Sequence, residues 1–172
     1  MAQQYLIIDE GNTRCKIALF QDDEVLWIKN LAQIEDFDPA ACHPDQIMFC
    51  SVRRKTTPAF LVNAYPQIYH WSHDGTLPFP SAYKTPLTLG KDRIANVMAL
   101  HFLTSEKSAK VAIDFGSCIT VDIVNQEGLY TGGSISPGFT MQLKALHNYT
   151  GQLPLIEANQ AQAKWGDSTE SA

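Results

Sequence analysis

The sequence is poor in cysteine, and its cysteines are scattered. A chain of 172 residues holds four of them, Cys15, Cys42, Cys50 and Cys118. None belongs to a C-x-x-C pair, and no histidine stands at zinc-finger spacing. A disulfide framework and a structural zinc site are therefore not expected, and the cysteines are typical of reduced thiols in a cytoplasmic protein.

Positive charge and long apolar runs are also scarce. Lysine and arginine number 13 against 18 aspartates and glutamates, which gives a net charge of -5. A mildly acidic protein has no broad electrostatic footprint for nucleic acid or for an anionic membrane. No apolar run approaches the ~18 residues of a membrane span, and residues 1–8 lack the basic and apolar regions of a signal peptide. We therefore expect neither nucleic acid nor membrane as a partner.

The sequence does have enough apolar residues for a folded core. Hydrophobic residues make up 45% and charged residues 18%, which is ordinary for a globular protein, and the length suits one large or two small domains. Strands are predicted from short apolar runs at residues 5–8, 15–20, 24–28, 46–52, 68–71, 110–113, 119–124 and 128–135. Helices are predicted at residues 57–65, 92–103 and 139–149. The proline-containing residues 72–89 predict a loop.

Two short turns repeat one pattern. Residues 9–11 (Asp-Glu-Gly) and 114–116 (Asp-Phe-Gly) each follow one apolar strand and precede another. A glycine there lets successive backbone N–H groups face an anion, and the carboxylate can hold a cation that neutralises phosphate charge. Two such turns facing each other across a cleft would hold a polyphosphate from both sides. The alternative to phosphate binding is a pair of ordinary tight turns. Independently of that choice, the repetition suggests that the protein has two related halves.

Four motifs, taken in order, resemble those of one enzyme family. They are Asp9-Glu10-Gly11-Asn12-Thr13-Arg14, Gly90-Lys91-Asp92-Arg93, Asp114-Phe115-Gly116-Ser117 and Gly132-Gly133-Ser134-Ile135-Ser136-Pro137-Gly138. They are similar to the D-x-G-N-T-[RS], G-x-D-R, D-x-G-T and G-G-x-I-x-P-G motifs of the type III pantothenate kinases. Tyr83 stands upstream of Asp92 as it does in that family. The resemblance covers essentially the whole sequence from Tyr5.

The resemblance implies a fold and an activity. The fold would be α/β, with duplicated actin-like or ribonuclease H-like domains of the acetate and sugar kinase, Hsp70 and actin superfamily. Residues 1–107 would form the first domain with the ATP phosphate loop, and residues 108–172 the second. Because family members continue past the motif around Thr169, we expect an incomplete second domain and a truncation at the C-terminus. The activity would be ATP-dependent phosphorylation of pantothenate to 4'-phosphopantothenate, the first step of coenzyme A biosynthesis. Magnesium, a monovalent cation (potassium or ammonium) and homodimer formation are implied as well.

The resemblance also implies roles for individual residues. ATP contacts would come from Asp9, Glu10, Gly11, Asn12, Thr13, Arg14, Cys15, Lys16 and Ser117. Pantothenate contacts would come from Tyr83, Gly90, Lys91, Asp92, Arg93 and Thr169. Asp114 would bind the monovalent cation, and Asp92 would accept the proton of the pantothenate hydroxyl. Residue chemistry agrees, because phosphoryl transfer requires positioning, charge neutralisation and a carboxylate that orients the nucleophile. An aspartate beside Arg93 stays ionised, and Arg93 suits a substrate carboxylate.

Plainer interpretations stay open for several of these residues. Asp92 and Arg93 are also typical of a charged first turn of a helix, Tyr83 of a loop aromatic and Thr169 of a helix cap. The family usually has an apolar residue where Glu10 stands. An extra carboxylate there would repel phosphates unless it points away or meets a cation.

Three classes of function remain. The first is the pantothenate kinase. The second is a nucleotide-binding homologue without catalysis, an accessory or regulatory factor for transcription. The third is a kinase of the same fold that acts on another small alcohol. The presence of Asp92 and Arg93 favours an enzyme, since a pure binding module needs no carboxylate at a transfer site.

Overall fold

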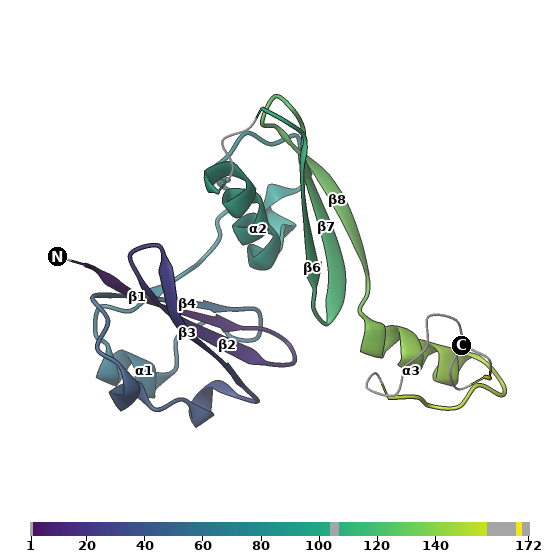
Figure 1. Cartoon of the computed structure of the whole chain (residues 1–172), viewed down its shortest axis with the longest axis horizontal. Coiled ribbons are helices and arrows are strands. Elements are labelled where there is room, and N and C mark those ends of the chain that lie inside the picture. The colour runs from purple at the N-terminus through teal and green to yellow at the C-terminus, as the bar shows by residue number, and fades with distance from the viewer. Residues whose placement is uncertain (1, 104–106, 158–167, 170–172) are drawn as a thin grey trace. The chain divides into compact units, whose positions relative to one another are not determined.

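The computed structural model describes residues 2–103, 107–157, 168 and 169. The protein divides into two compact units, Met1–Asp74 and Gly75–Ala172, and each is described by itself. Both combine helices with a β-sheet, so the predicted α/β class is confirmed at that level (Figure 1). Among the described residues, no helix is long and apolar enough to cross a membrane.

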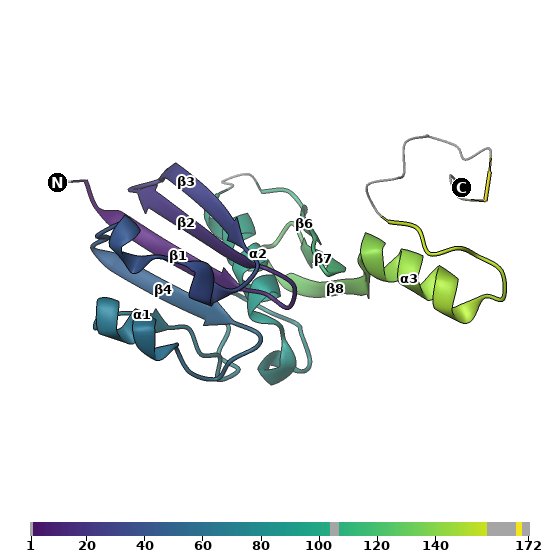
Figure 2. The ribbon, with the colours of Figure 1, turned by 90° about the horizontal axis from the view of Figure 1, so that it is seen from below.

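The first unit is built on a mixed five-stranded sheet, seen from a second side in Figure 2. Strands β1 (Gln4–Glu10), β2 (Cys15–Gln21) and β3 (Glu24–Leu31) form an antiparallel meander, which confirms that prediction. Strands β4 (Gln46–Ser51) and β5 (Tyr69–His70) add to it in parallel, and the order is β3-β2-β1-β4-β5. The carboxyl ends of β1 and β4 therefore lie side by side.

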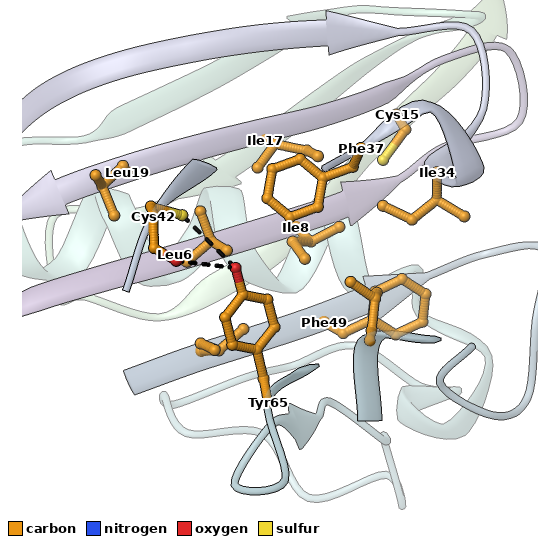
Figure 3. Packing of buried hydrophobic residues seen from close by; sticks show 12 residues of the cluster. Leu6, Ile8, Cys15, Ile17, Leu19, Ile34, Phe37, Cys42, Phe49 and Tyr65 are labelled. Atoms are coloured by element: carbon orange, nitrogen blue, oxygen red, sulfur yellow. Dashed lines mark hydrogen bonds between the residues drawn. The ribbon is translucent and has the colours of Figure 1, made fainter. Parts of the chain in front are cut away.

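Apolar side chains from one face of this sheet form the main core of the first unit (Figure 3). Alternate residues of the strands are buried, as in Leu6 and Ile8 of β1. The rest of the cluster comes from α1 (Ala59–Ala64) and from around two 3-10 helices, η1 (Ile34–Asp36) and η2 (Pro39–Ala41), which the sequence analysis does not anticipate. The Tyr65 hydroxyl donates to the carbonyl of Pro39 at 2.6 Å and so ties the end of α1 to η2.

The second unit has a three-stranded antiparallel sheet in the order β6-β7-β8. Its elements are η3 (Pro86–Thr88), α2 (Lys91–Phe102), β6 (Lys110–Phe115), β7 (Cys118–Val124), β8 (Tyr130–Pro137) and α3 (Phe139–Tyr149). Helix α2 packs against β6 and β7, and it buries Ile94 and Val97. The opposite face carries Val111, Ile113 and Phe115, all exposed among the described residues.

The expected division into domains of residues 1–107 and 108–172 stays a prediction, and the compact units are bounded differently. The boundary between them lies after Asp74, because α2 packs on β6 and β7 and so belongs with the residues that follow it. The structure thus groups the loop 75–89 and α2 with the second sheet. Whether the protein descends from two duplicated domains stays a prediction.

Candidate active site

The first candidate element is the turn between β1 and β2. The amide of Gly11 donates to the carbonyl of Arg14 at 3.0 Å, which closes the turn. The side chains of Asn12, Thr13, Arg14 and Lys16 are exposed around it. Two cations and polar groups next to a tight glycine turn form a surface that suits an anion such as a phosphate.

Glu10, beside that turn, is buried and meets a cation. Its side chain has no exposed area, and it accepts hydrogen bonds from Ser51 Oγ at 2.7 Å and from Arg54 Nε at 2.9 Å. Arg54 Nη2 also pairs with Glu35 at 2.8 Å. The negative charge of Glu10 is thus balanced by Arg54 within the protein. A carboxylate at this position is expected to be compatible with phosphate binding only if it points away or meets a cation, and it meets a cation. Its predicted contact with ATP stays a prediction.

Cys15 lies in the same segment but packs into the core of the first unit (Figure 3). Burial raises the pKa of its thiol to about 12, and the neighbouring carboxylates of Glu10 and Asp9 add to the shift. The thiol therefore stays protonated at neutral pH and is not a nucleophile. Because side chains alternate along a strand, Lys16 is exposed while Cys15 is buried.

The second candidate element is the start of α2. Gly90 is the N-cap, and its carbonyl accepts a hydrogen bond from the amide of Ile94 at 3.0 Å. A Cβ added to Gly90 would collide with Asp92 Oδ1, so the carboxylate of Asp92 leans back over the residue before the helix. Asp92 is exposed there. The carboxylate thus lies at the N-terminal, positive end of the helix dipole.

Arg93, the next residue, points into the protein and joins a buried polar cluster. Arg93 is 5% exposed, and Asp122 and Tyr130 have no exposed area. Arg93 Nε and Nη2 lie 2.9 Å and 2.7 Å from Asp122 Oδ1, and the Tyr130 hydroxyl donates to the same oxygen at 2.8 Å. Although burial lowers the pKa of Arg93, the hydrogen bond and charge of Asp122 outweigh it and raise that pKa overall. The guanidinium stays charged. Its Nε and Nη2 already have buried partners. The predicted contact of Arg93 with substrate stays a prediction.

Tyr83 lies beside this cluster. The amide of Tyr83 donates to Ser81 Oγ at 3.0 Å, and the amide of Ala82 donates to the carbonyl of Tyr130 at 2.9 Å, which fixes the loop to the start of β8. The ring of Tyr83 stacks on Tyr130 with centroids 5.7 Å apart, and the guanidinium carbon of Arg93 lies 5.8 Å from the Tyr83 centroid. The structure thus brings the predicted residues Tyr83 and Arg93 together.

The third candidate element is the turn between β6 and β7. The amide of Gly116 donates to the carbonyl of Cys118 at 2.9 Å, much as Gly11 closes the first turn. The amide of Gly138 donates to the carbonyl of Ser117 at 3.0 Å. A Cβ at Gly138 would collide with the carbonyls of Gly116 and Ser117. The last glycine of the motif 132–138 is therefore needed to hold this turn, and Ser117 is exposed on it.

Asp114, just before that turn, is the predicted cation ligand. It is half-buried, and its register partner on β7 is Thr120. Because such partners lie on the same face of a sheet, the two side chains are neighbours. The Thr120 hydroxyl is buried and has no hydrogen-bond partner among the described residues. A carboxylate and an orphaned hydroxyl oxygen fit a hard cation. No group of three or more His, Cys, Asp or Glu side chains gathers in the described part of the protein.

The remaining candidates are Lys91 and Thr169. Lys91 is the first residue of α2 and is half-buried. Thr169 is exposed, and the structure describes it together with Ser168 only. The structure therefore groups Tyr83 and residues 90–93 but does not bring Thr169 to them.

Asp122, Tyr130 and the Glu10–Arg54 pair are not among the predicted residues and interactions. Asp122 carried a signal, because it is a carboxylate inside the apolar strand Ile-Thr-Val-Asp-Ile-Val. A buried charge of that kind requires a partner. Tyr130 and Arg54 carried none, since a tyrosine after a turn and an arginine in a basic run are ordinary.

Comparisons with known proteins decide the family. The sequence model of the family described as type III pantothenate kinase matches residues 5–172. The chain belongs to the type III pantothenate kinase family. A type III pantothenate kinase of Bacteroides fragilis is 40% identical over 181 residues, and those of Phocaeicola vulgatus and Flavobacterium johnsoniae are 36% and 35% identical. In each case the match covers 97% of this chain and 71% of the relative.

A solved structure supports the fold. The protein is similar to the crystal structure of a conserved putative Baf family transcriptional activator from Campylobacter jejuni, with a TM-score of 0.56 and 20% identity. The match covers 96% of this chain and 70% of that one. At this identity the likeness concerns the fold.

Proposed function

We propose that this protein phosphorylates pantothenate to 4'-phosphopantothenate with ATP, as the first step of coenzyme A biosynthesis. The observation that carries the proposal is the exposed carboxylate of Asp92 in the first turn of α2, in sequence beside Arg93, whose guanidinium lies over the ring of Tyr83. A carboxylate so placed orients a hydroxyl group and accepts its proton. Family membership then names the alcohol.

The reaction divides among the residues by their chemistry. The oxygen of the 4'-hydroxyl attacks the γ-phosphorus of ATP, the bond to the ADP oxygen breaks, and Asp92 takes the hydroxyl proton. Lys91 and Tyr83 would contact pantothenate, and Gly90 leaves room for the Asp92 carboxylate. Thr169 is proposed as a further substrate contact from family resemblance alone.

The two glycine turns would contact ATP. Around the first turn, Arg14 and Lys16 are exposed cations, and Asn12 and Thr13 are exposed polar groups. Because Glu10 is paired with Arg54, its charge opposes phosphate binding less than a free carboxylate would. On the second turn Ser117 offers an exposed hydroxyl.

The cations of the reaction are part of the proposal. Magnesium would accompany ATP and neutralise phosphate charge. Asp114 and the Thr120 hydroxyl would hold a potassium or ammonium ion, which supplies positive charge near the phosphates. The residues present fit an oxygen-coordinated ion, because the Thr120 hydroxyl is buried without a partner among the described residues.

The wider architecture is proposed in the same way. The similar closing bonds at Gly11 and Gly116, each between the first two strands of a meander, support two related actin-like halves. Homodimer formation and a cytoplasmic location rest on family resemblance and composition.

The test is turnover of pantothenate by this protein of 172 residues. Mass spectrometry would follow 4'-phosphopantothenate formed with ATP and magnesium, with and without potassium. Asp92→Asn should lower turnover by roughly 10²- to 10⁴-fold while ATP binding, measured by calorimetry, stays nearly unchanged. Asp23→Asn makes the same chemical change at an exposed position outside the candidate site and should leave turnover intact.

Other results of these assays would contradict the roles assigned to Asp92 and Asp114 or favour another function. Full activity of Asp92→Asn would refute the assignment of the proton acceptor. ATP binding without any turnover would favour the regulatory homologue, and turnover of another small alcohol alone would favour a different substrate. Asp114→Asn should abolish the response to potassium, and an unchanged potassium titration would contradict the cation site.

A further inference from the structure

The cluster of Arg93, Asp122 and Tyr130 converges on one oxygen of Asp122, whose other oxygen, Oδ2, is buried without a hydrogen-bond partner among the described residues. A single oxygen, Asp122 Oδ1, receives Arg93 Nε, Arg93 Nη2 and the Tyr130 hydroxyl at 2.9 Å, 2.7 Å and 2.8 Å. Arg93 Nη2 also lies 2.9 Å from the Tyr130 hydroxyl oxygen. All three side chains are buried. Charge-assisted hydrogen bonds that converge in a buried cluster hold a planar guanidinium in one orientation.

The cluster joins a rigid strand to the start of a helix. Asp122 lies in β7, the central strand, where it is paired in register with Ala112 on one side and Gly133 on the other. Arg93 lies in the first turn of α2. Any rotation or sliding of that turn would move the guanidinium away from Asp122 Oδ1. The buried bonds therefore fix where α2 begins.

Asp92 is the immediate neighbour of the anchored residue. Consecutive helical residues point about 100° apart, so an inward Arg93 leaves Asp92 exposed. The Asp92 carboxylate leans over Gly90, while Tyr83 stacks on Tyr130 and lies under the Arg93 guanidinium. The position of the exposed carboxylate thus depends on the buried one.

We propose that Asp122 is a positioning residue, which acts through Arg93 and the first turn of α2 to place the carboxylate of Asp92 for proton acceptance. The inference rests on the proposed kinase function. It gives Arg93 mainly the role of an anchor, whereas the sequence suggested a contact with the substrate carboxylate.

The decisive experiment is a double-mutant cycle of Asp122→Asn and Asp92→Asn. Asparagine keeps the shape of Asp122 and removes the charge that holds the guanidinium. Asp122→Asn alone should lower kcat about tenfold or more, with KM for ATP and for pantothenate changed less than about twofold, because misplacement of a reacting group lowers rate steeply. In the Asp92→Asn background the same change should cause no further loss.

His101→Ala is the control for general damage to α2. His101 lies in the last turn and stacks on Phe79 with centroids 5.7 Å apart, away from the first turn. Its removal should loosen the last turn of the helix only, and lower kcat equally little in both backgrounds. Equal losses for Asp122→Asn in both backgrounds would overturn the proposal. A rise of KM for pantothenate alone would do the same and assign Arg93 to substrate binding.

Two further measurements cover failure of folding or of activity. If Asp122→Asn does not fold, Tyr130→Phe removes one hydroxyl from the cluster and should show the same pattern with a smaller loss of kcat. If the unmodified protein has no turnover, the proposed function fails, and amide hydrogen exchange of residues 94–97 tests the anchor alone. Faster exchange in Asp122→Asn but not in His101→Ala supports it, and unchanged exchange refutes it.

Discussion

The two sheets of this molecule are stabilised in different ways. The sheet of the first unit has one face closed by an apolar cluster in which Leu6, Ile8 and Phe49 have no exposed area. The sheet of the second unit meets α2 on one face, and on the other Ile113 and Phe115 are 55% and 76% exposed. The first unit thus closes one face of its sheet with apolar side chains, whereas the second buries the polar cluster of Arg93, Asp122 and Tyr130 beside its apolar residues.

The two buried carboxylates sharpen this contrast. Glu10 in the first unit is paired with Arg54, whose side chain is one-third exposed. Asp122 in the second is paired with Arg93, which is almost fully buried. Water can replace Arg54 in part but has little access to Arg93. Loss of the arginine should therefore lower the free energy of unfolding less in the first pair than in the second.

The largest expected effect comes from the core of the first unit. Phe49→Ala should lower its free energy of unfolding by about 3–5 kcal/mol, because a fully buried ring leaves a cavity. Phe115→Ala removes the same ring from an exposed place and should change stability by about 0.5 kcal/mol or less. Urea unfolding checks this, followed by the fluorescence of Trp27 and Trp71 for the first unit and by far-UV circular dichroism for both units. A large loss for Phe115→Ala would show that its face is covered in solution.

A smaller effect is expected at the Glu10–Arg54 pair. Arg54→Met leaves the Glu10 carboxylate buried with Ser51 as its remaining hydrogen-bond partner, and should lower the free energy of unfolding by about 1–3 kcal/mol. Arg53→Met removes an exposed arginine from the next position and is the matched control. Equal losses in the same urea assay would show that Arg54 contributes no more than a surface charge.

A double variant extends this prediction. Glu10→Leu combined with Arg54→Met replaces the pair by apolar side chains, and it should recover most of the stability lost in Arg54→Met. The recovery would agree with the apolar residue that the family usually has at this position. If the double variant were less stable than Arg54→Met alone, the bond between Ser51 and Glu10 would outweigh the cost of the unpaired charge.

Much of the fold could be predicted because short apolar runs alternate with glycine and aspartate turns. The strands around residues 5–8 and 110–113 and the helix around 92–103 are confirmed within a few residues. The 3-10 helices η1 and η2 were missed, since three-residue turns carry no periodic pattern. The bounds of the compact units do not follow from the sequence either, because the packing of α2 on β6 and β7 depends on contacts that hydrophobic periodicity does not reveal.

The candidate site was predictable only where its chemistry lies in local motifs. The turn at residues 9–16 and the segment 90–93 stand out as short strings of glycine and charge. The partners that hold them do not, since Arg54 is far from Glu10 in sequence and Asp122 is far from Arg93. Long-range pairs of this kind depend on how the strands are aligned in the sheet. A single sequence constrains that alignment only through its pattern of buried apolar residues.

The smallest effect concerns two cysteines, Cys15 in the first unit and the exposed Cys118 in the second. Burial raises the pKa of the Cys15 thiol from its ordinary value of 9.0 to about 12, helped by Glu10 and Asp9. Between these values the unfolded protein loses the Cys15 proton while the folded protein keeps it. The free energy of unfolding should therefore fall as pH rises from 9 towards 12, by at most about 1.4 kcal/mol per pH unit from this group.

Comparing the pH dependence of variants isolates that contribution. Cys15→Ala should lessen the fall in stability above about pH 9, and Cys118→Ala, which removes an exposed thiol from the second unit, is the matched control. Alkylation at about pH 8 provides a second readout, since iodoacetamide should modify Cys118 in the folded protein and reach Cys15 only on unfolding. Equal labelling of Cys15 and Cys118 in the folded protein would mean that the first unit opens readily, and the contrast between the two units would then fail.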